Sequence, residues 1–413
     1  MIIEFTCSNH RSISNPVTFS AVASSDEYLA DNIINQSNIN LLKTSVIYGA
    51  NGSGKSNLLS ALQYMQELVV NSVNNQPGDG IVQFPHKKRG QSIPSDYSIQ
   101  FTIDEIRFVY SFSVSHSVIV TESLYYFPNG RQAKIFDRND LNYTVGSHFN
   151  KRDFASAKQV LKQNRLLLSC IANFANVSVI DDVFRFFRDT LVIYTSDFID
   201  NWIGYSLNQI QTNENVKKIV IDFLNEMQIP VQDILVKNES IENSLSIDSL
   251  PPFLSDEFKR DILEARLQSA RLIFDGFSTD FFGEESSGVK KLIGMLCPIL
   301  DIIKKNKVLV ADEIETSLHE SIALAIVQLF NSSVSSSQLI FTTHDTSLLT
   351  PKLFRRDQIW FTEMSNDRNT DFYSLIEFNG VRKNEDFAKN YIDGKYGAIP
   401  VLNPSFMNLF AGE

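Results

Sequence analysis

The 413-residue chain contains 43% hydrophobic and 21% charged residues, which is typical of a soluble globular protein with a large core. Its formal net charge of −11 argues against nucleic-acid binding over the whole surface, so any such contact would need a local basic patch or a basic partner. There is no long apolar run and no signal-like N-terminus, and the three cysteines are far apart. We therefore expect no membrane span, no secretion, and reduced thiols in the cytoplasm.

The first third of the chain predicts mostly β-structure around one long helix. Apolar residues alternate with a period of two in the strand-like runs, and they recur at helical spacing after the first glycine-rich loop. In chain order we expect a β-hairpin from 1–6 and 16–22, a strand at 45–48, a helix from Ser56 to about Asn71, a loop at 72–96, and an antiparallel meander of four strands within 97–137.

Beyond this region, helical patterns dominate first and then alternate with buried strands. Continuous apolar strands separated by amphipathic helices predict a parallel sheet covered on both faces. No heptad pattern persists, so a long coiled coil is not expected. In chain order we expect helical stretches at 153–189 and 209–274, interrupted by a strand-like run at 191–196 and a polar stretch at 238–252, then helices at 287–304 and 317–331, and strands at 308–312, 338–343, 358–363 and 371–378.

The glycine-rich loop between the strand at 45–48 and the first long helix carries the strongest motif. It reads GxxxxGKS, in the strand–loop–helix context that confirms this phosphate-binding sequence. Glycines let successive N–H groups face phosphate oxygens, the lysine places a charge on the β- and γ-phosphates, and the serine hydroxyl ligates Mg²⁺. The motif predicts binding of ATP and Mg²⁺ through Gly49, Asn51, Gly52, Ser53, Gly54, Lys55, Ser56 and the following Asn57.

Two further motifs lie at the ends of later apolar strands. Asp312 is expected to hold the Mg²⁺ shell, and Glu313 to orient or deprotonate the attacking water. Such a pair on its own could cap a helix, but together with the glycine-rich loop it indicates ATP hydrolysis. The next strand ends in His344, which fits a switch that donates a hydrogen bond to the γ-phosphate or its water, although a lone histidine there is usually structural.

A fourth motif, Ser286-Ser287-Gly288, stands just ahead of a predicted helix. These residues can present a hydroxyl and N–H groups to an anion at the helix N-terminus. An isolated SSG is weak, but its place ahead of the acidic pair is where ATPases of the ABC class keep their signature. In that class the signature reaches the nucleotide held by the opposite subunit, which implies an ATP-dependent dimer. The absence of LSGGQ argues against a transporter subunit.

Together the four motifs resemble the ABC/SMC/RecF group of ATPases. Within it, the segment DEIETSLH from Asp312 to His319 resembles the overcoming-lysogenization-defect (OLD) type. In that type the residues after the acidic pair form a loop at the dimer interface, which implies this role for Ser317 and Leu318. The resemblance implies an α/β, ABC/SMC-type P-loop ATPase head. We expect an N-terminal ATPase lobe with an antiparallel β subdomain at 1–150, a mainly helical inserted lid at 151–275, and a C-terminal ATPase lobe at 276–413.

Two details of the resemblance concern the nucleotide. The N-terminal turn SNHRSI is similar to a turn near the nucleotide in this group, which implies Arg11 and Ser12 as site residues, with His10 where an aromatic residue is usual. The glutamine of the group's Q-loop is left open between Gln83 and Gln100.

The tail of the chain is similar to RloA-like proteins and, more distantly, to ATPase subunits of two-gene anti-phage systems. The similar segments are the stretch from Phe354 to Phe361, which begins Phe354-Arg355-Arg356, then Gly380-Val381-Arg382-Lys383, and the stretch from Gly394 to Pro400.

The resemblance implies a sensor or switch ATPase of prokaryotic anti-phage defence. Such a protein would form a homodimer or higher homo-oligomer around Mg-ATP, respond to a nucleic-acid or phage component as trigger, and control a separate effector such as a TOPRIM-type nuclease or a toxin. The chain has no DxD motif, and its fragment Glu257-Phe258-Lys259 reads as a solvated helix face, so we expect no nuclease of its own. The alternative is a RecF-like DNA-repair ATPase, which predicts DNA-stimulated hydrolysis and salt-sensitive DNA binding.

Overall fold

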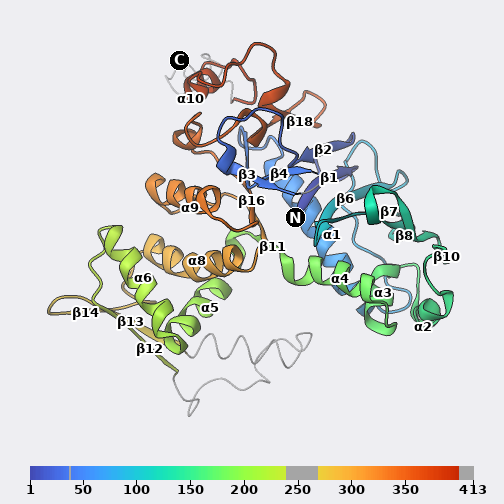
Figure 1. The fold of residues 1–413 in the computed structure, drawn as a ribbon, viewed down its shortest axis with the longest axis horizontal. Helices are drawn as coiled ribbons and strands as arrows, with labels where there is room; N and C mark the ends of the chain where they lie inside the picture. Colours follow the sequence, from blue (N-terminus) through green and yellow to red (C-terminus); the bar gives the residue numbers. More distant parts are fainter. Residues whose placement is uncertain (37–38, 239–267, 400–413) are drawn as a thin grey trace, which may run out of the picture. The chain divides into compact units, whose positions relative to one another are not determined.

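The computed structural model describes residues 1–36, 39–238 and 268–399 (Figure 1). Contacts divide the chain into two compact units. The first comprises Met1–Ile193, Asn306–Ile314 and Val327–Glu413, and the second comprises Tyr194–Lys305 and Glu315–Ile326. This grouping cuts across the ranges expected for the lid and the C-terminal lobe, because residues 155–193 pack around the helix that follows the glycine-rich loop. The fragment Glu257-Phe258-Lys259 lies outside the described residues.

An antiparallel sheet of seven strands forms one layer of the first unit, in the order β10-β9-β8-β7-β6-β1-β2. The N-terminal hairpin is confirmed, because β1 pairs antiparallel with β2 and places Phe5 opposite Phe19. The meander is also confirmed, with β10 as an additional strand. Alternate side chains such as Tyr97, Ile99 and Phe101 are buried, as the period of two requires. The strands are β1 Ile2–Ser8, β2 Val17–Ser20, β6 Ser95–Ile103, β7 Ile106–Ser115, β8 Val118–Tyr126, β9 Ala133–Asn139 and β10 Asn142–Val145.

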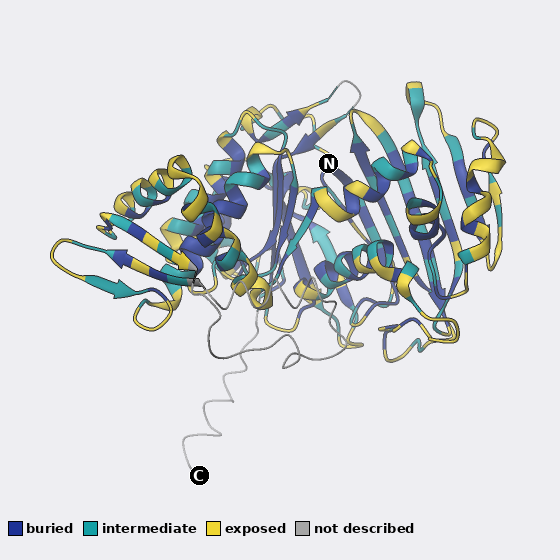
Figure 2. Ribbon diagram, turned by 90° about the horizontal axis from the view of Figure 1, so that it is seen from below, coloured by how far each residue is buried: buried dark blue, intermediate teal, exposed yellow. Residues whose placement is uncertain are grey.

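A six-stranded sheet in the order β11-β15-β16-β5-β17-β18 forms the other layer of this unit. Strands β15, β16, β5 and β17 are parallel and almost wholly buried, as their continuous apolar runs predict (Figure 2). One expectation was wrong, because β18 runs antiparallel to β17. The strand-like run expected at 191–196 is confirmed as β11, which lies at the edge of this sheet. The strands are β5 Thr44–Gly49, β11 Leu191–Tyr194, β15 Val308–Ala311, β16 Gln338–Thr342, β17 Ile359–Met364 and β18 Thr370–Ser374.

Helix α1 (Lys55–Asn71) packs between these two sheets. Leu58, Leu59 and Leu62 line one apolar core region with Ile2 of β1 and Val310 of β15. The long apolar face predicted for this helix is therefore covered on both sides. The expected helix at 153–189 is broken into three short helices, which close the same core: α2 Ala155–Val160, α3 Leu167–Phe174 and α4 Ser178–Arg185.

The second unit combines helices with a three-stranded antiparallel sheet, ordered β12-β13-β14 (Figure 1). Residues 209–274 were expected to be mainly helical. Helices α5 and α6 cover most of 209–226 as expected, but residues 233–238 and 268–273 form strands β12 and β13. Ala270 and Leu272 are buried on alternate positions of β13, which is strand periodicity. Helix α5 packs closely on α8, since a Cβ atom at Gly294 would lie 2.7 Å from Ile203. The elements are α5 Ile199–Thr212, α6 Glu214–Glu226, β12 Asp233–Asn238, β13 Gln268–Ile273, β14 Ser278–Asp280 and α8 Ser287–Lys304.

The remaining elements are short, apart from α9. This helix was expected to begin at residue 317, but it begins at Glu320 because Ser317 has a φ of 64°, outside the helical region. Across the described parts of the chain, no single helix is long and apolar enough to cross a membrane. One bent pair, Leu167–Phe174 with Ser178–Thr190, reaches the required length and apolar composition when the two helices are taken together. The further elements are β3 Ile33–Asn35, β4 Asn40–Leu42, α9 Glu320–Ser332 and α10 Phe387–Ile392.

Candidate active site

The glycine-rich loop joins the end of β5 to the start of α1. Gly52 and Gly54 have φ angles of 78° and 108°, which residues with a side chain rarely adopt. A Cβ atom at Gly49 would lie 2.3 Å from Thr362 Oγ1, and one at Gly54 would lie 2.0 Å from Thr370 Oγ1. No side chain among the described residues caps the N-terminus of α1. The loop therefore forms a cradle of backbone at the positive end of a helix, which suits an anion.

Two threonines from the C-terminal strands hold this loop in place. Thr362 Oγ1 of β17 lies 2.6 Å from Ser53 Oγ, and Thr370 Oγ1 of β18 donates to the Ser53 carbonyl at 2.9 Å. Thr370 Oγ1 in turn lies 2.7 Å from Ser12 Oγ, which accepts a hydrogen bond from Asn57 Nδ2 at 2.6 Å. A relay of hydroxyl groups thus connects the N-terminal turn, the glycine-rich loop and the last strands of the sheet.

Lys55 and His344 meet at the carboxyl ends of β5 and β16. Lys55 is buried, and its Nζ donates to the Gly49 carbonyl at 2.8 Å. The same Nζ lies 3.0 Å from His344 Nε2. Because an ammonium group only donates, Nε2 is the acceptor here and the imidazole proton of His344 is on Nδ1. The parallel pairing of β16 with β5 is what brings the two side chains to one edge of the sheet.

Ser56 and Asp312 form a pair of oxygen ligands. Ser56 Oγ donates to Asp312 Oδ1 at 3.1 Å. A hydroxyl and a carboxylate suit Mg²⁺, which takes one or two protein oxygens and completes its shell with phosphates and water. The described residues contain no group of three or more His, Cys, Asp or Glu that could hold a metal ion by themselves. The pair therefore fits a metal ion that is shared with a bound nucleotide.

Thr342, at the end of β16, orients both acidic residues, although the sequence pattern indicated no role for it. Its buried Oγ1 donates to Asp312 Oδ1 at 2.6 Å and accepts from the Glu313 N–H at 2.8 Å. Glu313 has a φ of 47°, a conformation that costs energy for a residue with a side chain. The hydrogen bond from its N–H helps to hold this conformation.

Glu313 is placed to act on water. Its Oε1 lies 3.6 Å from His344 Nε2, and the two side chains are 47% and 39% exposed, so solvent reaches both. A carboxylate beside an imidazole, open to solvent and next to a phosphate-binding loop, can orient a water molecule and accept its proton.

A cavity of about 760 Å³ borders the start of α1, and its lining includes Arg11, Ser12, Asn57, Gln83 and Phe84. The Arg11 N–H donates to the Phe84 carbonyl at 2.6 Å, and the Arg11 guanidinium lies 5.1 Å from the centre of the Phe84 ring. Gln83 thus lies beside the phosphate-binding helix.

Gln100, the other Q-loop candidate, lies within β6, where its Nε2 donates to Glu4 at 2.7 Å.

His10 takes the place of an aromatic residue in the turn before Arg11. It is fully buried, with ring nitrogens 2.8 Å from Tyr97 Oη and 2.9 Å from Ser60 Oγ. It also packs against the rings of Tyr64 and Phe84. Burial, with a smaller contribution from the Arg11 charge, lowers the pKa of His10 from 6.5 to about 3. The ring is therefore neutral, and its hydrogen bonds and aromatic contacts hold the turn in place.

The signature residues lie beside Ser317 and Leu318, the residues expected at the dimer interface, in the second unit. Ser286 is the N-cap of α8, and its exposed Oγ accepts from the Val289 N–H at 3.2 Å. A Cβ atom at Gly288 would lie 2.9 Å from the Ser317 carbonyl, so the two segments touch. Ser287 is exposed beside them, and Leu318 packs against the core of this unit.

The structure therefore assembles the predicted residues in two groups. The first unit brings together the glycine-rich loop with Lys55, Ser56, Asp312, Glu313 and His344, and places Arg11 at the neighbouring cavity. The second unit holds Ser286, Ser287, Gly288 and Ser317. Sequence reasoning missed Thr342, Thr362 and Thr370, since a threonine in a strand is ordinary and only the fold shows what its hydroxyl contacts.

Comparison with known proteins is informative at the level of the family. Residues 45–160 and 177–350 match the family described as "AAA domain, putative AbiEii toxin, Type IV TA system". No protein of curated function matches the sequence.

Several solved structures are similar to the chain at low sequence identity. An SMC head bound to the C-terminal winged-helix domain of ScpA is 15% identical with a TM-score of 0.45, covering 90% of this chain and 97% of that chain. The SMC head domain from Thermotoga maritima is 13% identical with a TM-score of 0.41, covering 90% and 98%. An Smc head with an extended coiled coil, bound to the C-terminal domain of ScpA derived from Pyrococcus furiosus, is 15% identical with a TM-score of 0.40, covering 90% and 96%.

Proposed function

Because the chain belongs to this family of AAA domains, we propose that it binds and hydrolyses ATP with Mg²⁺. Its fold is the expected ABC/SMC-type P-loop ATPase head with an antiparallel β subdomain. The observation that carries the proposal is the convergence of Lys55, Ser56, Asp312, Glu313 and His344 at the carboxyl edge of the parallel strands.

Each residue has a defined task in this proposal. The N–H groups from Gly52 to Ser56 and the Lys55 ammonium hold the phosphates, while Ser56 and Asp312 supply protein oxygens to Mg²⁺. The metal ion neutralises charge on the phosphates when it is bound. Glu313 orients the attacking water and accepts its proton, and His344 positions the same water or the terminal phosphate.

The cavity beside Asn57 is the proposed place for the nucleoside. It is continuous with the start of α1, and Arg11 and Phe84 offer a planar cation and an aromatic ring for stacking. Gln83, and not Gln100, would then be the glutamine nearest the nucleotide.

We further propose that a second copy of the chain completes each site. The N-terminus of α8, with Ser286, Ser287 and Gly288, offers N–H groups to an anion, and Ser286 and Ser287 are exposed. The glycine-rich loop belongs to the first unit. In a two-fold dimer each site would combine the loop of one protomer with the signature of its partner.

A mixing experiment tests this arrangement. Lys55→Ala and Ser286→Arg should each abolish hydrolysis. A one-to-one mixture should recover about a quarter of the wild-type rate, because half of the pairs would be mixed and each would have one intact site. Asn208→Arg, which introduces the same charge at an exposed position of α5 outside the proposed site, serves as the control and should hydrolyse ATP at close to the wild-type rate. If the mixture stays inactive while both variants bind ATP and pair normally, the shared site is wrong.

At the cellular level we propose a sensor or switch subunit of anti-phage defence that controls a separate effector. Support comes from the family, whose description names a toxin of a type IV toxin–antitoxin system, and from the resemblance of the DEIETSLH and tail segments. The alternative, a RecF-like repair ATPase, predicts that DNA ends or gaps stimulate hydrolysis. Plaque assays with the gene and its neighbours, in wild-type and Lys55→Ala form, separate the two: protection that requires Lys55 supports defence, and its absence with DNA-stimulated hydrolysis supports repair.

A further inference from the structure

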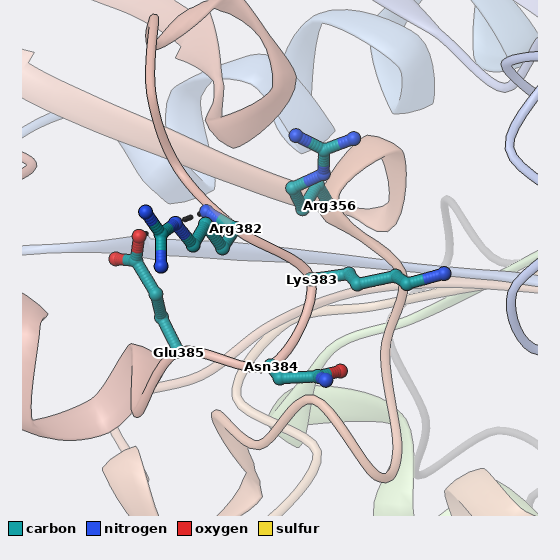
Figure 3. A pocket seen from close by; sticks show the side chains of 5 residues that line it. All are labelled: Arg356, Arg382, Lys383, Asn384 and Glu385. Atoms are coloured by element: carbon teal, nitrogen blue, oxygen red, sulfur yellow. Dashed lines mark hydrogen bonds between the residues drawn. The ribbon is translucent and has the colours of Figure 1, made fainter.

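Another cavity, lined mainly by basic residues, lies in the C-terminal part of the first unit. It has a volume of about 670 Å³ and is lined by Arg356, Arg382, Lys383, Asn384 and Glu385 (Figure 3). Its cations come from two of the tail segments that the sequence singled out, and the ATP site uses neither. Arg356 stands in the turn before β17, and Arg382 and Lys383 stand on the loop that precedes α10.

Hydrogen bonds fix the backbone around this cavity, while the charged side chains remain in its lining. Arg356 Nη1 donates to the carbonyl of Val381 at 2.7 Å, and Val381 itself is buried, so the loop is fixed to the turn before β17. The Arg382 N–H donates to Glu385 Oε1 at 2.8 Å, and the Glu385 N–H donates back to the Arg382 carbonyl at 3.2 Å. Such a closed turn presents Arg382 and Lys383 with little freedom of the backbone.

Positive charge is in excess in this cavity. Three cations line it, and the one carboxylate, Glu385, is bound by Lys395 from outside the lining at 2.5 Å. The pKa of Glu385 is lowered by this hydrogen bond and by the Arg382 N–H, so the carboxylate stays ionised and committed to those partners. Asp26 is 3.4 Å from Arg356 Nη2 and offsets part of that charge, while Arg356 Nε is buried and makes no hydrogen bond within the described residues.

This cavity is separate from the ATP site. Arg356 precedes β17, which runs parallel to β5 and pairs Ile359 with Val46 and Thr362 with Gly49. The ATP site follows the carboxyl end of β5, whereas the basic cavity lies at the opposite, amino end of these strands. The strand residues from Ile359 to Thr362 alone span about 10 Å at 3.3 Å per residue, and Arg356 lies three residues further from the ATP site. A phosphate in one site could not also contact the other.

We infer that the basic cavity binds a phosphate group of a second ligand. The Arg382 guanidinium offers forked hydrogen bonds to phosphate oxygens, the Lys383 ammonium offers a point charge, and Arg356 adds positive charge to the lining. An acidic peptide is the weaker alternative, because the lining offers no aromatic or aliphatic pocket of the kind that anchors a peptide. The phosphate could belong to the backbone of a single-stranded nucleic acid or to a small phosphorylated molecule, and the chemistry of recognition is the same.

Binding assays on the full chain test this inference independently of ATP hydrolysis. Fluorescence anisotropy would follow a labelled oligothymidylate, and calorimetry would follow inorganic pyrophosphate. Both would use Lys55→Ala protein that also carries Gly54→Ala, because the Cβ added at Gly54 would disrupt the phosphate-binding loop and keep the ATP site from contributing. The test variant is Arg382→Gln with Lys383→Gln, which leaves the structural contacts of Arg356 in place. The matched control is Lys352→Gln with Lys389→Gln, which removes the same charge from two exposed lysines that do not line the cavity.

The expected loss of affinity for the test variant is about 10- to 100-fold, with the control within about twofold of the Gly54→Ala, Lys55→Ala parent. For a nucleic acid, the slope of log affinity against log salt should fall by about 1.4, the value for two lost contacts to a single strand. Binding of pyrophosphate but not of the oligonucleotide would identify a small phosphorylated ligand. The inference fails if neither probe binds, if test and control variants bind equally, or if polyglutamate competes as well as the phosphate probes.

Discussion

Replacing Thr342 by valine should show how much the orientation of Asp312 and Glu313 contributes to the rate of ATP hydrolysis, because both carboxylates remain in place. Valine keeps the shape of the side chain but removes the hydrogen bonds to Asp312 Oδ1 at 2.6 Å and from the Glu313 N–H at 2.8 Å. One of these is a buried bond to a carboxylate, and together they are worth about 2 to 4 kcal/mol. If about 2 kcal/mol of this orients the two acidic residues in the transition state, hydrolysis should slow by about 30-fold.

The assay is steady-state ATP hydrolysis together with urea unfolding. In the Thr342→Val enzyme, kcat should fall by a larger factor than KM rises, because the Lys55 ammonium and the backbone cradle that hold the phosphates are unchanged. Thr342→Ser is the matched control, since it keeps the hydroxyl and loses one methyl group, at a cost of about 1 kcal/mol in stability. Its kcat should remain close to that of the wild type.

The reasoning is refuted if the Thr342→Val protein is folded and hydrolyses ATP at the wild-type rate. It is refuted equally if Thr342→Ser is as slow as Thr342→Val, because the methyl group and not the hydroxyl would then matter.

Three further predictions concern packing, protonation and buried charge. Gly54→Ala should abolish binding of a fluorescent ATP analogue and lower stability by about 2 kcal/mol, because φ is 108° and the new Cβ would meet Thr370 Oγ1; circular dichroism checks that the chain folds. Since the pKa of His10 is about 3 in the folded protein against 6.5, the unfolded chain binds the extra proton, so stability should fall by about 1.4 kcal/mol per pH unit between those values as the pH drops. His10→Phe should flatten that dependence in urea unfolding, and an unchanged slope would contradict it. Arg138→Met should cost about 3 to 5 kcal/mol by stranding the fully buried Glu122, and adding Glu122→Gln should recover part of the loss in the same assay.

The sequence determined the local chemistry of the proposed site. A glycine-rich loop between an apolar strand and a helix can form the same backbone cradle in any protein, because φ angles above zero at Gly52 and Gly54 are a local property. Continuous apolar runs ending in Asp312 and in His344 already implied parallel strands whose polar ends share one edge. These inferences rest on local chain geometry and on the pattern of apolar residues along each strand.

Tertiary structure alone decided which distant side chains support that chemistry. Thr362 and Thr370 reach Ser53 from strands some 300 residues later in the chain, and Thr342 acquires its role only where β16 lies beside β15. Likewise, the pairing of β17 with β5 places Arg356 at the edge of the sheet opposite the ATP site. The sequence alone does not show which group a hydroxyl or a guanidinium will contact. Its function depends on the partner that long-range strand pairing brings within hydrogen-bonding distance.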